Sequence, residues 1–347
     1  MPVIQTVDQS LPVEMERFWV VPQNKMALQQ NFIVWALKKA ESDHFDKKLY
    51  FGGCHEDSSD MCLSYVNGSV QKERLLECTH EEADDRVLFH LNHAVQVGYY
   101  RSVVIASEDT DIFISAIHHF PELKCHDLQQ LWFFSGRGDS KTFFPIHDLS
   151  NLLDTNFVRV LIPIHDLTGA DSVSKVGTKR SATIEGLKNF ELLSGFGQRA
   201  LTAEMIDNAE KFLLKCITKH QVKTFDELRY TVYHEKHLEF DIERFPPTSD
   251  SIRQHIMRAY LQCFKRRQSP FMESIELDPV NYGYRIDEDE KLVPVISTKP
   301  PIPSNFPHPC SCQKCSKANV CKCRVLGVAC CVYCKCKACS DCKNPVK

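Results

Sequence analysis

The stretch SVVIASEDTD, from Ser102 to Asp111, places a short apolar strand directly before a group of acids. The β-branched run from Ser102 to Ala106 is typical of a buried parallel strand. Upstream, apolar residues fall at helical spacing over 87–94 and Gly98 closes the helix, while downstream the polar turn opens a second apolar helix. The order helix, strand, helix predicts an α/β fold with a doubly wound, mostly parallel sheet.

Further elements continue this body toward the carboxyl terminus. Leu131–Phe134 is a plausible strand, Phe157–Leu167 is apolar enough for another buried element, and beyond Ala182 the pattern turns helical. Thr202 and the run Pro246–Ser249 are suited to begin two of these helices. The basic trio 265–267 has two interpretations, a solvated helix end or part of a nuclear-import signal.

Composition excludes several classes of protein. The chain has 347 residues, 43% of them hydrophobic and 25% charged, which is typical of a globular protein of one large or two small domains. No stretch approaches the roughly 20 apolar residues of a membrane span. The run from Ser297 to Pro309 contains five prolines and has no periodic pattern, so it predicts a semi-rigid linker.

Cysteines concentrate at the carboxyl end. Eleven of the seventeen lie between Cys310 and Cys342, in a segment with almost no apolar side chains to form a core. The amino terminus lacks the pattern of a secretory signal, which predicts an intracellular protein in which clustered thiols bind metal. A secreted disulfide module is the alternative. We therefore expect zinc to hold this segment together.

The spacing of these cysteines resembles the tesmin-type CXC domain over residues 310 to 345. The pattern is Cys-x-Cys, Cys-x-Cys, six residues to Cys330, then Cys-x-Cys-x-x-Cys. That resemblance implies about three zinc ions on nine cysteines, and DNA binding. Cys331 and the final Cys-x-x-Cys depart from the pattern, so eleven cysteines compete for about nine places. The candidate zinc ligands are Cys310, Cys312, Cys315, Cys321, Cys323, Cys330, Cys334, Cys336, Cys339 and Cys342.

Charge separates this tail from the body. From Ile296 onward nine Lys or Arg stand against the single acid Asp341, whereas the rest of the chain has a net charge of −11. With the zinc and thiolate numbers that the resemblance implies, the tail falls from +8 to about +5. A basic tail attracts nucleic-acid phosphates in a salt-dependent way. The alternative is a solvated tail that only folds around zinc. The candidate DNA contacts here are Lys322, Arg324, Lys335 and Lys337.

Three acidic turns lie in the body. Glu82-Ala-Asp84-Asp85 opens a helix, Asp109 and Asp111 follow the strand, and Asp171 lies in a glycine-containing turn. Strand ends and following helix starts meet at one edge of a parallel sheet, so these acids are expected to converge there. Their mutual repulsion favours Mg²⁺ or Mn²⁺ between them. Each turn also has a structural explanation, because acids stabilise helix starts and Thr79-x-x-Glu82 fits a capping box.

The ordered series resembles the flap-endonuclease and bacterial 5′-nuclease family, a branch of the PIN-like fold. The matching residues, within about 80–187, are Glu82-Ala-Asp84-Asp85, Gly98-Tyr99, Asp109-Thr-Asp111, Leu167-Thr-Gly-Ala-Asp171, then Gly177 and Lys179. The resemblance implies that Glu82, Asp84, Asp109, Asp111 and Asp171 bind two divalent ions that cleave phosphodiesters, and that Lys179 holds a phosphate.

One part of that family pattern is missing. The family begins with a strand that ends in Asp, and no such strand stands out before Gln71; Glu56 and Asp57 are the nearest substitutes. The enzyme interpretation, a Mg- or Mn-dependent DNA phosphodiesterase, therefore stands beside a non-catalytic one, a DNA-binding or protein-interaction scaffold targeted by its CXC domain.

The whole arrangement also resembles animal proteins of transposable-element origin. That resemblance implies a nuclear, DNA-binding protein that is a truncated or domesticated copy of a longer one. The predicted organisation is an amino-terminal segment of the α/β body (1–75), a PIN-like core (76–187), a helical region (188–275), a proline-rich linker (276–309) and a zinc domain (310–347).

Overall fold

The computed structural model divides into two compact units. The first comprises Met1–Val176, Asn189–Met205 and Ala259–Asp278, and the second comprises Gly177–Lys188, Ile206–Arg258 and Pro279–Lys347. The residues that the structure describes are 18–53, 60–80, 82–170, 174, 176, 186–236, 245–272, 275–299, 310–316, 320–325, 330, 334–336 and 342–344.

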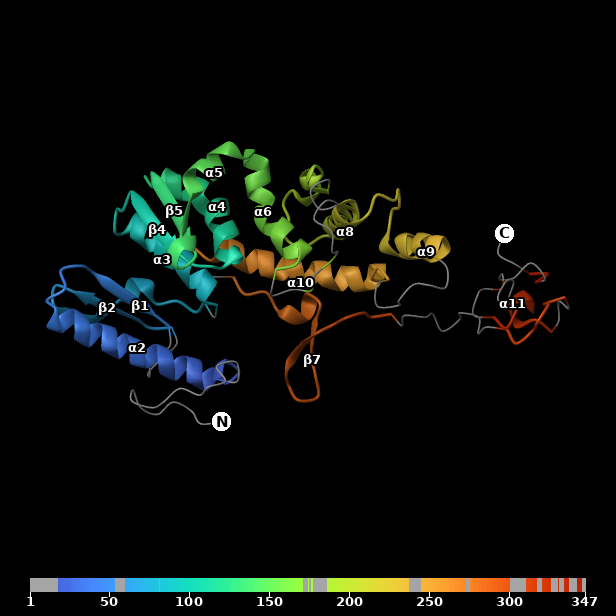
Figure 1. Ribbon diagram of the computed structural model, residues 1–347, viewed down its shortest axis with the longest axis horizontal. Helices are drawn as coiled ribbons and strands as arrows, with labels where there is room; N and C mark the ends of the chain where they lie inside the picture. The colour runs from blue at the N-terminus through green and yellow to red at the C-terminus, as the bar shows by residue number, and fades with distance from the viewer. Residues whose placement is uncertain are drawn as a thin grey trace. The chain divides into compact units, whose positions relative to one another are not determined.

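The first unit begins with a helix and a three-stranded antiparallel sheet (Figure 1). Helix α2 spans Pro22–Ser42, and the strands are β1 (Leu49–Gly52), β2 (Cys62–Val66) and β3 (Ser69–Lys72), in the order β1-β2-β3. Asn67 and Gly68 both have positive φ, 51° and 79°, as a two-residue hairpin turn requires. The Tyr65 hydroxyl donates to the Ala40 carbonyl at 3.1 Å and so ties the sheet to the helix.

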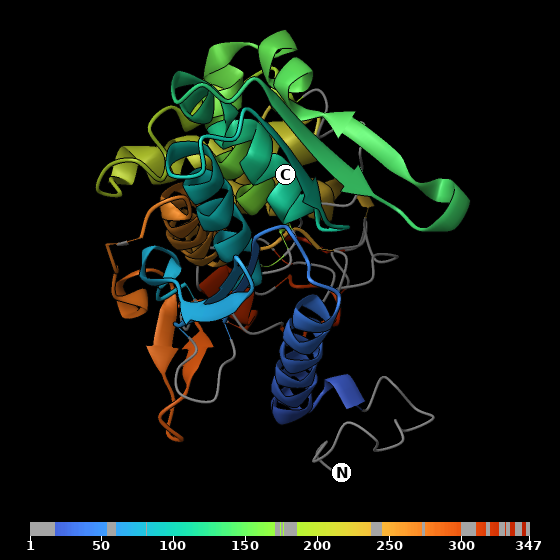
Figure 2. The ribbon, with the colours of Figure 1, turned by 90° about the vertical axis from the view of Figure 1, so that its left-hand side faces the viewer.

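The expected helix, strand, helix series follows. Helix α3 spans Ala83–Gln96, strand β4 spans Ser102–Ala106 and helix α4 spans Thr110–Cys125. The chain then forms β5 (Gln130–Ser135), β6 (Thr142–Pro145), α5 (Ile146–Leu152) and α6 (Thr155–Thr168). The β5–β6 hairpin is drawn in green in Figure 2. Leu88, Ile105, Ala116 and Leu131 lie in the hydrophobic core that joins these elements.

The sheet of this region is mixed. Its order is β4-β5-β6, with β4 and β5 parallel and β5 and β6 antiparallel. The α/β class is therefore confirmed, while β4–β5 is the only parallel pair among the described strands. Strand β4 was expected to be buried, but it lies at the edge of its sheet and Val104 is 54% exposed. A β-branched run alone does not distinguish an edge strand from a central one.

Helices dominate the later part of the chain, as the sequence predicts. Helix α8 spans Ala203–Ile217, α9 spans Phe225–Lys236 and α10 spans Ser249–Gln268. A short hairpin, β7 (Tyr284–Ile286) and β8 (Leu292–Pro294), precedes the one-turn helix α11 (Lys322–Val325) in the cysteine-rich tail. The described residues contain nine α-helices, none of which is long and apolar enough to cross a membrane.

The carboxyl-terminal end of α10 belongs to the first unit and is held there by backbone contacts. His119 Nε2 lies 3.2 Å from the Arg266 carbonyl, and the Asn92 side-chain amide donates to the Pro270 carbonyl at 2.8 Å. These contacts bring the basic trio 265–267 against α3 and α4, where Arg266 is only 3% exposed. The interpretation of the trio as a solvated helix end is therefore wrong for Arg266.

Candidate metal centres

Three carboxylates converge where α3 and α4 begin. Asp84 lies in the first turn of α3, Asp109 is the N-cap residue of α4 and Asp111 lies in its first turn. One oxygen of each lies within 4.8 Å of the others, a spacing that suits a single cation. The structure thus brings together three of the five carboxylates that the sequence singled out. We call Asp84, Asp109 and Asp111 the carboxylate cluster.

Each of these residues also has a local structural reason for its place. The Asp109 side chain accepts a hydrogen bond from the Asp111 backbone N–H at 2.7 Å and so caps α4. The N-cap residue of α3 is Glu82, not Thr79, and the Glu82 side chain makes no capping hydrogen bond. The capping box predicted for Thr79 and Glu82 is therefore not the start of this helix. Glu82 does not contribute to the carboxylate cluster. Asp171 and Lys179 lie outside the described residues.

Asp111 is already engaged by two partners. The Nε2–H of His165 donates to Asp111 Oδ1 at 2.5 Å, and the Arg266 guanidinium forms an ion pair with Oδ2. These contacts hold the pKa of Asp111 down to about 2 against the opposing effect of burial. Neither partner was predictable from local sequence patterns, because His165 and Arg266 lie 54 and 155 residues away along the chain.

A second buried carboxylate shares the same arginine. Asp166 is fully buried, and its Oδ1 lies 3.2 Å from Arg266 Nε. Among the described residues, neither carboxylate oxygen of Asp166 has a hydrogen-bond partner of acceptable geometry. Burial raises the pKa of Asp166 to about 7, although Arg266 opposes that shift. Arg266 is therefore a fixed internal cation between Asp111 and Asp166.

The pKa of Asp84 reflects the negative charge of the cluster that Arg266 does not compensate. Desolvation, together with the nearby Asp109 and Asp111, raises the pKa of Asp84 to about 6. The like charges favour either a proton or a metal ion at this position. A metal ion bound here would meet Asp84 and Asp109 first, because the oxygens of Asp111 are shared with His165 and Arg266.

A hollow lies at the carboxyl ends of β4 and β5, and its lining includes Glu108, the residue before Asp109. Its volume is about 340 Å³, and Ala106, Ser107, Phe134, Gly136 and Arg137 are among its lining residues. The Arg137 side chain is 90% exposed and lies 3.2 Å from Glu108. The hollow therefore offers a solvent-facing cation within a few residues of Asp109.

The second centre is the cysteine cluster of the tail. The described tail cysteines form four overlapping sets of four thiols, and Cys310 and Cys330 each belong to three sets. Eight of the nine are buried and Cys312 is partly exposed. We call these nine the cysteine cluster: Cys310, Cys312, Cys315, Cys321, Cys323, Cys330, Cys334, Cys336 and Cys342.

The sulfur separations fit zinc rather than disulfides. Sγ–Sγ distances are 3.5 Å for Cys310–Cys315 and Cys323–Cys334, and 3.8 Å for Cys321–Cys330. A tetrahedron of 2.3 Å Zn–S bonds has edges of about 3.8 Å, whereas a disulfide requires about 2.05 Å. Thiols shared between sets are suited to bridge neighbouring ions. The prediction of a thiol cluster able to bind zinc is confirmed; Cys339 and Lys337 lie outside the described residues.

Protons compete for these sulfurs. Burial raises the pKa of Cys310 to about 12, so that thiol is neutral at pH 7 without a metal ion. Burial acts the same way on Cys321, but the Arg324 amide and neighbouring thiols bring its pKa to about 6. Zinc binding at the cluster must therefore release protons.

The expected DNA-contacting residues of the tail divide into two kinds. Lys322 and Lys335 are exposed. The Arg324 guanidinium instead donates to the carbonyls of Cys315 and Ser316, at 3.2 and 3.3 Å. Arg324 thus stabilises the loop that carries Cys315 and is less available to phosphate than its sequence position indicated.

Comparison of this chain with protein families, curated proteins and solved structures gives no significant match. Its function must therefore be argued from the two clusters themselves.

Proposed function

We propose that the chain is a zinc-containing DNA-binding protein whose carboxylate cluster holds one Mg²⁺ or Mn²⁺ ion for phosphodiester cleavage. The observation that carries this proposal is the convergence of the Asp84, Asp109 and Asp111 carboxylates within 4.8 Å of one another. Hard divalent cations prefer such oxygen ligands. We also propose, on the sequence resemblance, a PIN-like core, a CXC domain, a nuclear location and a transposable-element origin.

We propose one divalent ion at the carboxylate cluster, not two, because of the position of Arg266. The family resemblance implies two, but a guanidinium already compensates Asp111 and Asp166 on the buried side of the cluster. A second divalent ion there would face that cation at short range, and the repulsion in a poorly solvated site is large. Arg266 therefore takes the place that a second ion would otherwise occupy.

Each protein group has a distinct role in this proposal. Asp84 and Asp109 hold the ion, and His165 fixes the orientation of Asp111 through its 2.5 Å hydrogen bond. The bound ion would activate a water molecule and stabilise negative charge on the phosphate oxygens. Arg137, exposed at the hollow, would bind the phosphate of the incoming strand.

The tail would supply non-specific affinity for DNA. Lys322 and Lys335 are exposed on the cysteine cluster, and the tail as a whole is basic while the rest of the chain is acidic. Binding of this kind depends on phosphate charge and falls as salt rises. The net charge that remains after zinc binding is modest, so we expect moderate affinity.

The test is cleavage of single-stranded and branched DNA by the full chain with Mg²⁺ or Mn²⁺. Asp84→Asn combined with Asp109→Asn keeps the side-chain size and should abolish cleavage, since removing metal ligands costs several kcal/mol of transition-state stabilisation. Asp148→Asn, at an exposed position on α5, is the matched control and should cleave normally. Cleavage that persists in the double variant would refute the nuclease.

A non-catalytic scaffold is the second candidate, and one observation favours it. Both oxygens of Asp111 are satisfied by protein groups, so the fold does not need an ion to balance that carboxylate. In that case the full chain binds duplex DNA at low salt but cleaves no substrate. If neutralising Lys322 and Lys335 also leaves DNA binding unchanged, zinc is only a structural element and the partner is a protein.

A further inference from the structure

One edge of strand β4 pairs with no described strand. It is the terminal strand of its sheet, and its ladder to β5 begins with Gln130 N donating to Arg101 O and ends with Ser107 N donating to Phe134 O. Backbone groups of alternate residues point to opposite sides of a strand. Val104 and Ala106 therefore direct their N–H and C=O groups to the open edge, where no described strand pairs with them.

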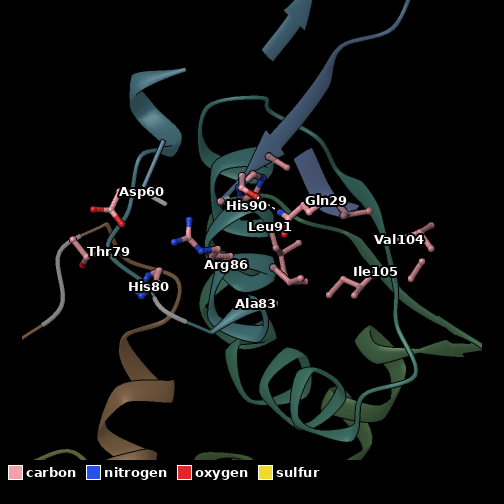
Figure 3. A pocket seen from close by; sticks show the side chains of 16 residues that line it. Gln29, Asp60, Thr79, His80, Ala83, Arg86, His90, Leu91, Val104 and Ile105 are labelled. Atoms are coloured by element: carbon pink, nitrogen blue, oxygen red, sulfur yellow. Dashed lines mark hydrogen bonds between the residues drawn. The ribbon is translucent and has the colours of Figure 1, made fainter. Parts of the chain in front are cut away.

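A cavity of about 760 Å³ runs along this edge. Figure 3 shows Val104 and Ile105 at one end of it, with Leu91 of α3 toward them, while the Arg86 side chain points to the opposite end, near His80 and Asp60. Much of the remaining wall is small or apolar, with Gly52, Gly53, Ala83, Val87 and Ala94. The space beside the edge is thus narrow, partly apolar and open to backbone hydrogen bonding.

Arg86 is the cation of this cavity. It lies near the start of α3 and is partly buried, and no described residue forms a hydrogen bond or an ion pair with its guanidinium. The neighbouring His90 is uncharged at pH 7, because burial lowers its pKa to about 4. His80 is engaged by the Phe271 carbonyl at 2.9 Å. Asp60, across the cavity from Val104, is also engaged in an interaction (Figure 3).

We propose that β4 binds an extended peptide segment as an added strand, and that an acidic side chain of this segment pairs with Arg86. Strand addition to an open edge takes its affinity from main-chain hydrogen bonds and its selectivity from side-chain pockets. The Arg86 guanidinium, which has no ion-pair partner among the described residues, supplies that selectivity here, because a partly buried arginine gains most from a carboxylate. The site shares Ala106 with the Arg137 hollow, and no member of the carboxylate cluster lines it.

The walls of the cavity argue against a nucleic-acid ligand. A nucleic-acid strand carries one negative charge per nucleotide and needs several cations along its path, whereas Arg86 is the one Lys or Arg among the described lining residues. Apolar residues such as Val87, Leu91 and Ile105 instead suit the alternating side chains of a β-strand.

The first test measures binding of two fluorescein-labelled, end-capped peptides to the full chain. One is Thr-Val-Thr-Val-Glu-Val-Thr and the other carries Lys in place of Glu. We expect the Glu peptide to bind about tenfold more tightly, as a charge-assisted hydrogen bond allows. Arg86→Gln should remove this preference, whereas Arg101→Gln, which removes an exposed arginine outside the cavity, should retain it.

The second test examines the edge itself. Val104→Pro removes one of the backbone N–H groups that point to the open edge of β4. It should weaken binding of the Glu peptide about fivefold or more. In the wild-type chain, the same peptide should slow hydrogen exchange at the Val104 and Ala106 amides, which needs no variant. Absence of binding at millimolar peptide, equal affinity for both peptides, or unchanged exchange at these amides would each overturn the proposal.

Discussion

The two candidate metal centres of this chain are built in opposite ways. The cysteine cluster is itself the core of its segment, since the buried side chains among the described tail residues are thiols. The carboxylate cluster sits on helices fixed by a separate hydrophobic core that includes Ile112, Ala116 and Leu131. We therefore expect the fold of the first centre to require metal, whereas the carboxylates of the second are held by a core that contains no metal ligands.

Their charges are handled differently as well. Burial raises the pKa of Cys310 to about 12, so that thiol stays protonated until a metal ion displaces the proton, whereas the pKa of Cys321 is lowered to about 6. The carboxylates are partly compensated by Arg266, a cation supplied by the chain. The difference implies that removal of metal unfolds one region and only changes the electrostatics of the other.

The largest expected effect is that of zinc removal. Structural zinc in small cysteine domains contributes about 10–16 kcal/mol to folding, and the described residues of the tail form no core other than the thiols. A strong chelator should abolish amide protection at Cys321, Cys330 and Cys334 while leaving that of Ile117 and Phe120 unchanged. Two-dimensional NMR of the full chain measures both regions in one sample. Simultaneous loss of amide protection in the tail and in the body would contradict the proposed difference between the two centres.

Arg266→Met comes next. It leaves Asp111 and Asp166 buried without their cation, which should cost about 3–5 kcal/mol of unfolding free energy. Urea unfolding of the body measures the loss, and Arg253→Met, an exposed position on the same helix, should cost below about 0.5 kcal/mol. If the variant folds, added Mn²⁺ should restore part of its stability. A variant as stable as the control would show that Arg266 has no compensating role.

Asp84→Asn is expected to increase the free energy of unfolding at neutral pH, by less than Arg266→Met decreases it. The pKa of Asp84 is raised from 3.8 to about 6, so its contribution to stability is full below pH 4 and is lost as the pH rises to 6. Because the side chain is partly exposed and screened, we expect about 1 kcal/mol. Without divalent ions, the variant should thus be more stable than wild type at pH 7.5 and equal to it at pH 4. Destabilisation at pH 7.5 would contradict the repulsion inferred for the cluster.

The smallest effect concerns DNA binding by the tail. Lys322→Gln and Lys335→Gln should each lower the slope of log K against log salt by about 0.9, if each contacts one phosphate. Lys47→Gln, at an exposed position in the body, should leave the slope unchanged. Fluorescence anisotropy with a labelled duplex, at several salt concentrations, distinguishes these cases. An unchanged slope in both tail variants would assign DNA binding, if present, to the body.

Local patterns predicted the local structure well. The apolar spacing before Gly98 became α3, the run Ser102–Ala106 became β4 and the Thr202 start became α8. The Asp109 cap and the gathering of the tail thiols were also visible in the sequence, because both depend on residues close together along the chain.

Long-range partners were not predictable in the same way. Arg266 lies in a basic trio that looks solvated, and only the packing of α10 against α4 and α6 carries it to Asp111 and Asp166. The edge position of β4 depends likewise on which strands pair, which a β-branched run does not encode. The domain boundaries drawn from composition remain predictions.

The most direct test of the single-ion carboxylate cluster is a titration of the zinc-loaded full chain with Mn²⁺, followed by electron paramagnetic resonance of the free ion. We expect one Mn²⁺ per chain, and none at the same concentrations after Asp84→Asn with Asp109→Asn. Zinc content, measured in parallel, should be equal in both proteins. Two Mn²⁺ ions per chain, or one that persists in the double variant, would contradict the proposal that Asp84 and Asp109 hold a single ion beside Arg266.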